Sequence, residues 1–316
     1  MESIVEIADR LRAQNARVVM GMEGVIELML VALLCEGHVI LEGVPGTGKT
    51  LLARCFSRSL DLEYRRVQFT PDLMPADILG TNIFNFQKNE FILQRGPIFT
   101  EFLLADEINR TPPKTQAALL EAMQERTVTL DGTGYALSPM FLVVATQNPI
   151  EQEGTYPLPE AQLDRFLFKL HVGFPSEEQE KAMVTLHGHQ TAMPDLDRLD
   201  VRPQVKREEI LAMRQAVASL HLSDEMVSYI VALVRATRTH AGLLHGASPR
   251  SANMLATAAR AFAAISGRAY AIPDDVKALF LPALRHRVVM TPTAHIEGSD
   301  TDAILRQVLA SIPAPR

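Results

Sequence analysis

The residues with the clearest chemical meaning form a glycine-rich segment that ends in Lys-Thr. The segment fits the pattern G-x-x-x-x-G-K-T and consists of Gly43, Val44, Pro45, Gly46, Thr47, Gly48, Lys49 and Thr50. An apolar run, 39–41, precedes it and a helical stretch from Leu51 follows it, which is the strand–loop–helix context that a phosphate loop requires. Its backbone N–H groups can then surround the phosphates of a nucleotide at a helix start. Lys49 would reach the β- and γ-phosphates, and Thr50 would bind Mg²⁺.

Two acidic residues, Asp106 and Glu107, come directly after the apolar run 102–105. Parallel sheets present their chemistry at the carboxyl ends of the strands, so both side chains would face the phosphate loop. Asp106 would hold Mg²⁺, directly or through water, and Glu107 would orient and polarise the attacking water. Without the phosphate loop, the Asp-Glu pair could be a solvated strand end, but downstream of such a loop it becomes a strong signal. Because a kinase uses the hydroxyl of its acceptor as nucleophile, a Glu beside the Mg²⁺ ligand favours an ATP hydrolase over a kinase.

Three further polar residues each have a structural and a catalytic explanation. Asn148 follows the apolar run 141–146 and could position the water or contact the γ-phosphate, or it could be a turn residue before Pro149. Arg165 could pair with Asp164, or it could be an arginine finger that reaches the ATP of a neighbouring subunit. Arg250 could be a solvated arginine at a helix start, or it could bring a second domain onto the phosphates. Spacing alone leaves these alternatives open.

The elements that must position these residues alternate between strands and helices in the first half of the chain. Helices are expected at 51–60 and 113–124, and strands at 39–41, 66–69, 102–105, 141–146 and 166–172. This alternation predicts an α/β fold with a mostly parallel sheet between helices. Two β-hairpins interrupt it, one near 81–94 and one near 127–137, where Asp131-Gly132 forms the turn.

The second half of the chain has a different pattern. At roughly 150 residues per domain, a chain of 316 residues is expected to form two domains. We expect an α/β core over 1–188, which ends with a helix at 176–187, a polar linker with two prolines over 189–206, and a smaller all-α domain over 207–316. Ser223 and Ser248 can cap helices in that domain, and Pro273 opens a further one.

Composition excludes several classes of protein. Apolar residues are 47% of the chain and charged residues 22%, which excludes a disordered chain. The formal charge of −6 argues against nucleic-acid binding. The chain lacks an apolar stretch near the ~20 residues of a membrane-spanning helix. Two cysteines, Cys35 and Cys55, exclude a disulfide-stapled secreted domain and are expected to be buried thiols. Without a signal-peptide pattern, the expected location is the cytoplasm.

Longer runs around the candidate residues resemble the AAA+ ATPases, and among them the MoxR family. The runs that carry the resemblance are 37–46, 68–72, 104–110, 112–116, 119–123, 145–149 and 154–166. They cover the expected core almost end to end, whereas the helical domain is similar mainly in length and in Ser248-Pro249-Arg250. The insertion at 81–94 looks like the helix-2 insert that marks one AAA+ branch, and the hairpin at 127–137 looks like the one that precedes sensor 1.

The resemblance implies a P-loop AAA+ core followed by an all-α lid, with ATP and Mg²⁺ as ligands. Glu107, Lys49, Asn148 (sensor 1), Arg165 (arginine finger) and Arg250 (sensor 2) would be catalytic, and Thr50 and Asp106 would bind the metal. The nucleotide would contact residues 43–50, Leu51 and Asp106. Family members form rings, usually hexamers, and act as chaperone-like machines on client proteins, often with von Willebrand A-domain proteins. Met22 stands where the family usually has Gln, in the segment that lines the adenine pocket.

Three functions are therefore compared. The first is an ATP-driven ring that remodels or matures partner proteins, with Arg165 supplied by the neighbouring subunit. The second is a scaffold that ATP binding assembles and in which hydrolysis is incidental; the intact Glu107 and Arg165 argue against it. The third is a DNA-remodelling relative, against which the acidic chain and the lack of a basic run argue.

Overall fold

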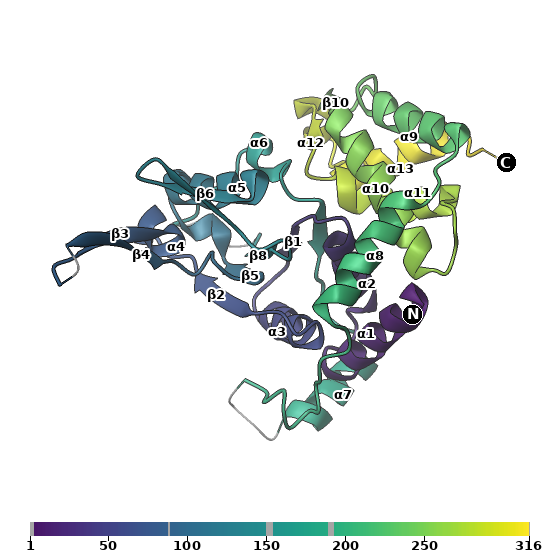
Figure 1. The fold of residues 1–316 in the computed structure, drawn as a ribbon. Helices are drawn as coiled ribbons and strands as arrows, with labels where there is room; N and C mark the ends of the chain where they lie inside the picture. Colours follow the sequence, from purple (N-terminus) through teal and green to yellow (C-terminus); the bar gives the residue numbers. More distant parts are fainter. Residues whose placement is uncertain (1–2, 88, 150–153, 189–192, 316) are drawn as a thin grey trace.

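The computed structural model describes residues 3–87, 89–149, 154–188 and 193–315, and its centre is a five-stranded parallel sheet (Figure 1). The spatial order is β2 (Tyr64–Gln68), β5 (Phe102–Asp106), β8 (Leu142–Gln147), β1 (Val39–Glu42) and β9 (Phe168–His171). All five predicted strands are confirmed. The second of them, β2, begins two residues before its predicted start at residue 66, because Tyr64 already pairs with Phe102.

Helices cover both faces of the sheet, as predicted for an α/β fold. One face packs against α1 (Ile4–Val18), α2 (Glu23–Leu34) and α3 (Lys49–Ser59). The other packs against α4 (Pro75–Leu79) and α5 (Pro113–Glu125). The five residues of β5 are all buried, which explains why its sequence is an uninterrupted apolar run up to Asp106.

Two β-hairpins leave the core where the sequence predicts them. The first consists of β3 (Gly80–Asn85) and β4 (Glu90–Arg95), and the second of β6 (Thr127–Leu130) and β7 (Thr133–Ala136). Asp131 and Gly132 have positive φ values of 48° and 79°, which is the conformation of the predicted turn. Asn82 Nδ2 donates to Asp131 Oδ2 at 2.7 Å, so the hairpins contact each other. In Figure 1 the first hairpin extends away from the sheet and helices.

The C-terminal part is helical and forms the expected lid. Its helices are α8 (Arg207–Ser219), α9 (Asp224–Thr237), α10 (Pro249–Ile265), α11 (Pro273–Leu284), α12 (Pro292–Ile296) and α13 (Thr301–Ser311). Ser223 caps α9 as predicted, since its side chain accepts from Met226 N. The lid also contains a short antiparallel pair, β10 (Leu243–His245) with β11 (Val289–Met290), which helical periodicity did not predict because so few residues take part.

Lid and core are joined by one continuous apolar cluster. Buried residues of α1 and α2 pack in the same cluster as those of α8 and α10. Arg214 of α8 reinforces this contact by donating to Leu33 O at 3.0 Å and to Pro139 O at 2.8 Å. Residues 189–192 of the predicted linker lie outside the described residues, whereas Val201 and Val205 are buried. The domain limits 1–188, 189–206 and 207–316 stay a prediction.

A buried histidine fixes β1 against its neighbours. His38 lies just before β1, and its Nδ1 accepts from Val143 N of β8 at 3.0 Å. Its Nε2 lies 3.3 Å from Met123 O of α5, and because a carbonyl only accepts, this nitrogen carries the hydrogen. Burial, together with the charge of Arg126, lowers the pKa of His38 from its usual 6.5 to about 3. The folded protein therefore holds a neutral imidazole at this position.

The burial of His38 predicts an acid-sensitive fold. Between pH 6.5 and about 3 the unfolded chain binds a proton at His38 that the folded chain does not. Stability therefore falls as pH falls through this window, by about 1.4 kcal/mol per pH unit for this group. We expect denaturant unfolding at pH 7, 6 and 5 to give a shallower dependence for His38→Gln than for the wild type. Equal slopes for the two proteins would contradict the assignment.

Candidate active site

The phosphate loop connects β1 to α3 and is closely packed. A Cβ atom on Gly43 would lie 2.3 Å from Val172 O, so only glycine fits beside β9. Gly48 has φ of +86° and is the residue before the first turn of α3, a backbone conformation that favours glycine. These constraints leave the loop backbone and the start of α3 facing the cleft at the carboxyl edge of the sheet, as anion binding requires.

Lys49 points back into the loop. Its Nζ donates to Gly43 O at 2.8 Å and to Val44 O at 2.7 Å, and it lies 3.3 Å from Thr47 Oγ1. Partial burial lowers the pKa of Lys49, and the negative charges of Asp106 and Glu107 act in the opposite direction. A phosphate would offer this ammonium group charged oxygens in place of neutral carbonyls, so the loop fits a nucleotide.

Asp106 at the end of β5 contacts residues from three neighbouring segments. Thr146 Oγ1 donates to its Oδ1 at 2.6 Å. Arg66 donates to Oδ2 from Nε at 3.0 Å and from Nη2 at 2.7 Å. Thr50 Oγ1 lies 3.4 Å from the same Oδ2. The hydroxyl and the carboxylate are thus adjacent, and both are the hard oxygen donors that Mg²⁺ prefers.

Glu107 is held in a conformation that sets its direction. Its φ of 57° places it in the left-handed region, and its N–H donates to Thr146 Oγ1 at 2.8 Å. Gln68 Nε2 donates to Glu107 Oε2 at 2.6 Å, and Arg110 Nε lies 3.1 Å from the same oxygen. A non-glycine residue in this region is strained and persists only where its surroundings fix it. Both of these contacts are made to Oε2 of the carboxylate.

A cleft of about 470 Å³ brings most of the predicted site residues together. Its lining includes Lys49 and Thr50 of the loop, Asp106 and Glu107 after β5, and Asn148 after β8. These strands are neighbours in the sheet, so their carboxyl ends meet at one edge as expected. Among the described residues no cluster of three or more His, Cys, Asp or Glu could hold a metal ion. Mg²⁺ commonly keeps several waters and binds through one or two protein ligands together with phosphate oxygens.

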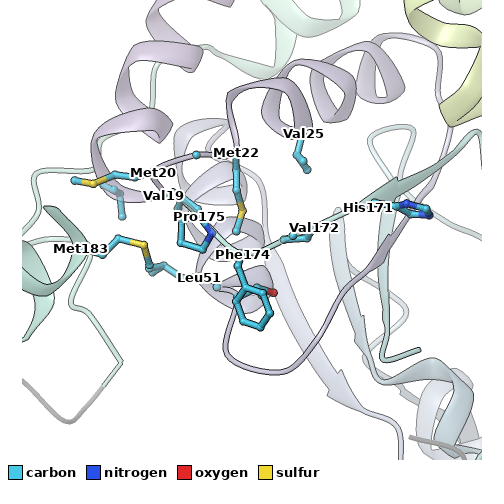
Figure 2. Close-up of a pocket in the computed structure, with 15 residues that line it drawn as sticks. Val19, Met20, Met22, Val25, Leu51, His171, Val172, Phe174, Pro175 and Met183 are labelled. Carbon is cyan, nitrogen blue, oxygen red and sulfur yellow. The ribbon is translucent and has the colours of Figure 1, made fainter. Parts of the chain in front are cut away.

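A second, smaller pocket adjoins the cleft and shares Gly48 and Leu51 with it. It measures about 80 Å³ and is mainly apolar (Figure 2). Met22 lies in its wall, at the start of α2, beside Val25 and opposite Phe174 and Pro175. Met22 and its neighbours thus form a mainly apolar pocket next to the phosphate loop.

Two of the predicted catalytic residues lie outside this cleft. Arg165 follows α6 (Glu160–Leu163), and neither it nor Arg250 is among the residues that line the cleft. Arg250, at the start of α10, has its Nη1 3.9 Å from Asp164 Oδ2. Arg250 therefore faces Asp164, the residue before Arg165. The sequence left open whether Asp164 pairs with Arg165, and in the structure Asp164 contacts the lid instead.

Sequence reasoning missed the residues that orient the two acids. Arg66, Gln68 and Thr146 contact Asp106 or Glu107, and the sequence analysis assigned them no role. A signal was available, because Gln68 and Thr146 stand at the ends of predicted strands, as the acids do. Their partners follow from the strand order, in which β5 lies between β2 and β8.

Comparison with known proteins agrees with this fold. A family model described as "ATPase family associated with various cellular activities (AAA)" matches residues 38–168, and a model described as "AAA lid domain" matches residues 235–308. A crystal structure from Cytophaga hutchinsonii, described as that of a candidate ATPase, has a TM-score of 0.90 at 38% identity and covers 99% of this chain and 96% of that one.

Several relatives match over nearly the whole chain. Chaperone MoxR1 of Mycobacterium tuberculosis is 40% identical over 99% of this chain and 83% of its own length. The uncharacterized protein YeaC of Bacillus subtilis is 44% identical over 95% of this chain and 92% of its own length. Protein MoxR of Paracoccus denitrificans is 31% identical over 94% and 93%, respectively.

The fold and the site are therefore those of an AAA+ ATPase. Within this class the chain belongs to the MoxR family, which confirms the resemblance and the α/β core with a helical lid. In the part of the chain that the structure describes, we find no helix that combines the length and apolarity needed to cross a membrane.

The contacts of Thr146 predict a loss of turnover when its hydroxyl is removed. Thr146→Val keeps the shape of the side chain but leaves Asp106 Oδ1 and the N–H of Glu107 without this partner. We expect kcat for ATP to fall about 10- to 100-fold, as for other residues that orient metal ligands, while ATP affinity stays close to wild type. Steady-state ATPase kinetics and nucleotide titration measure the two quantities. Thr239→Val, exposed in the lid, is the matched control, and an unchanged kcat in Thr146→Val would refute the role.

Proposed function

We propose that this protein hydrolyses ATP at the subunit interfaces of a ring, which we expect to be a hexamer. It uses the cycle of ATP binding and hydrolysis to remodel or mature partner proteins. The observation that carries the proposal is the division of the candidate residues. Lys49, Asp106 and Glu107 line one cleft, whereas Arg165 lies outside it. The cleft of one subunit thus lacks the arginine finger. This is expected if two neighbouring subunits form each ATP site together.

The chain's own residues then have separate roles in the reaction. Lys49 and the loop N–H groups bind the phosphates, and the pocket beside Met22 takes the base. Mg²⁺, when bound by Thr50 and Asp106, neutralises charge on the phosphate oxygens. Glu107 takes the proton from the attacking water, and Asn148 positions that water. Arg250 faces Asp164 here and would turn from it to reach the phosphates of its own subunit, and Arg165 would reach those of the neighbour.

The first hairpin supports a role in contacting client proteins. Phe86 is 87% exposed and Phe91 71% exposed, and both rings lie against Phe84, with centroids 5.2 Å away. Ile83 on β3 is also exposed. Exposed apolar groups clustered on a projecting element are typical of protein-binding surfaces. We place the client on this hairpin.

Other parts of the proposal rest on the family alone. Chaperone MoxR1 is described as a chaperone, and we extend this description to the present chain. A von Willebrand A-domain protein is the partner we expect. The cytoplasm is the compartment we propose, in agreement with two free cysteines, Cys35 and Cys55, the second of them buried.

The shared site predicts a specific effect of Arg165→Ala. An arginine supplied in trans contributes roughly 10³- to 10⁵-fold to the rate, so we expect ATPase activity to fall by about 10³ while ATP still binds. The wild-type rate per subunit should rise steeply with protein concentration, because a lone subunit lacks the finger. Both are measured as ATPase rate against concentration. Arg198→Ala, on an exposed arginine, is the control, and a rate indifferent to concentration and to Arg165 would reject the ring mechanism.

The hairpin predicts a loss of client binding without a loss of ATPase activity. Burying one Phe side chain contributes about 1.5–3 kcal/mol, so Phe86→Ala with Phe91→Ala should weaken binding of a permanently unfolded probe protein more than tenfold. Reduced, carboxymethylated lactalbumin and fluorescence anisotropy serve for the measurement. Ile296→Ala is the matched control, because Ile296 is also 87% exposed but lies in the lid. If the double Phe variant binds the probe as the wild type does, or if Ile296→Ala weakens binding to the same extent, the client site is elsewhere.

A further inference from the structure

Three consecutive lid residues contact the segment that carries Arg165 or the strand β9 that follows it. They are Arg285, His286 and Arg287, which follow directly on the end of α11. Arg285 Nη1 donates to Lys169 O at 3.2 Å, and His286 Nε2 lies 3.0 Å from Phe166 O. Neither the sequence motifs nor the comparisons assign a role to this cluster.

Arg287 makes the most extensive contact. Its Nε donates to Asp164 Oδ1 at 2.7 Å, and its Nη2 donates to Asp164 O at 3.1 Å and to Phe166 O at 2.5 Å. Its Nη1 donates to Leu167 O at 3.1 Å. The side chain is only 2% exposed. Because the five N–H donors of a guanidinium lie in one rigid plane, several simultaneous bonds fix the segment in both position and orientation.

The core alone does not satisfy this segment. Phe166 and Leu167 are buried, and buried carbonyl groups require hydrogen-bond partners. The core supplies the bonds on the N–H side: Leu167 N donates to His38 O at 2.7 Å, and the N–H groups of residues 164–166 donate to carbonyl groups within 160–163. On the carbonyl side, the partners of Asp164, Phe166 and Leu167 come from Arg287 and His286 of the lid. The path of the backbone through residues 164–167 therefore depends on the lid.

Arg165 lies inside the segment that Arg287 holds. Its neighbours on both sides, Asp164 and Phe166, are bonded to Arg287. Arg165 itself makes no side-chain hydrogen bond or ion pair with the described residues, so its direction is set by the backbone that carries it. Asp164 also faces Arg250, at 3.9 Å, which is the lid arginine expected to reach the ATP of its own subunit.

We propose that Arg287 and Asp164 are positioning residues for Arg165, so that the lid of one subunit sets the position of the finger that this subunit offers to its neighbour. The proposal rests on the shared site of the proposed function. Arg250 and Arg287 belong to the same lid and both face Asp164, so the lid contacts this carboxylate through two arginines.

The first test compares conservative variants on both sides of the contact. Arg287→Lys keeps the positive charge but loses the planar fork, and Asp164→Asn keeps the volume but loses the negative charge. We expect both to bind ATP like wild type and to hydrolyse it about 100-fold more slowly, the loss typical of a catalytic group misplaced by ~1 Å. Arg268→Lys is the control: Arg268 also forms a two-bond pair with a lid aspartate, Asp275, but does not contact residues 164–167.

The second test separates a finger defect from damage to the subunit's own site. Glu107→Gln subunits lack the base but carry an intact finger. Mixed one to one with Arg287→Lys subunits before assembly, they should restore ATPase activity to about a quarter of the wild-type rate, because in random mixing one interface in four pairs an intact cleft with an intact finger. Arg165→Ala mixed with Glu107→Gln is the reference and should give the same value.

Each outcome has a defined meaning. If the reference mixture is restored and the Arg287→Lys and Asp164→Asn mixtures are not, the two residues act within their own subunit and the positioning role is wrong. The same conclusion follows if both variants hydrolyse ATP at the wild-type rate, or if Arg268→Lys matches them in both tests. If the reference mixture itself stays inactive, the shared site is rejected, and the inference is rejected with it.

Discussion

The arrangement of the site depends on the placement of β5 between β2 and β8. Gln68 pairs in register with Asp106, and Ala105 pairs with Ala145, so the residues just past Ala105 and Ala145 meet at the same edge. Side chains alternate between the faces of a strand, so a shift of one residue would turn Asp106 away from Thr146. All five residues of β5 are buried between the two helix layers. The core therefore anchors the edge of the sheet that carries Asp106.

Features encoded in adjacent residues could be predicted from the sequence. The phosphate loop, the two acids after β5 and the turn at Asp131-Gly132 depend on local backbone preferences and on short apolar runs. The partners of the acids could not be predicted in the same way. Arg66 reaches Asp106, and Gln68 reaches Glu107, only because β2 and β5 are neighbours, and no local pattern specifies strand order. The pair β10–β11 was missed because a strand of two or three residues has no periodicity.

The lid could be predicted as a set of helices, but its contacts with the core could not. A single Arg in a sequence is compatible with solvent exposure, and only the tertiary structure reveals that Arg287 is almost fully buried among carbonyl groups. Burial lowers the pKa of Arg287, and its hydrogen bond with Asp164 opposes that shift. Because removing one partner from a buried charged contact is costly, this contact constrains the segment strongly.

The two kinds of contact between lid and core have different mechanical consequences. The apolar packing of α10 on α2 is non-directional, and such surfaces can slide by small amounts while remaining in contact, whereas Arg214 ties α8 to α2 by its bond to Leu33 O. The bonds from Arg287 to residues 164–167 are directional and break when the groups separate. A small rotation of the lid over α2 is therefore expected to carry this segment with it. In a ring, Arg165 would move with the lid that follows it in sequence, although it lies in the part of the chain that forms the core.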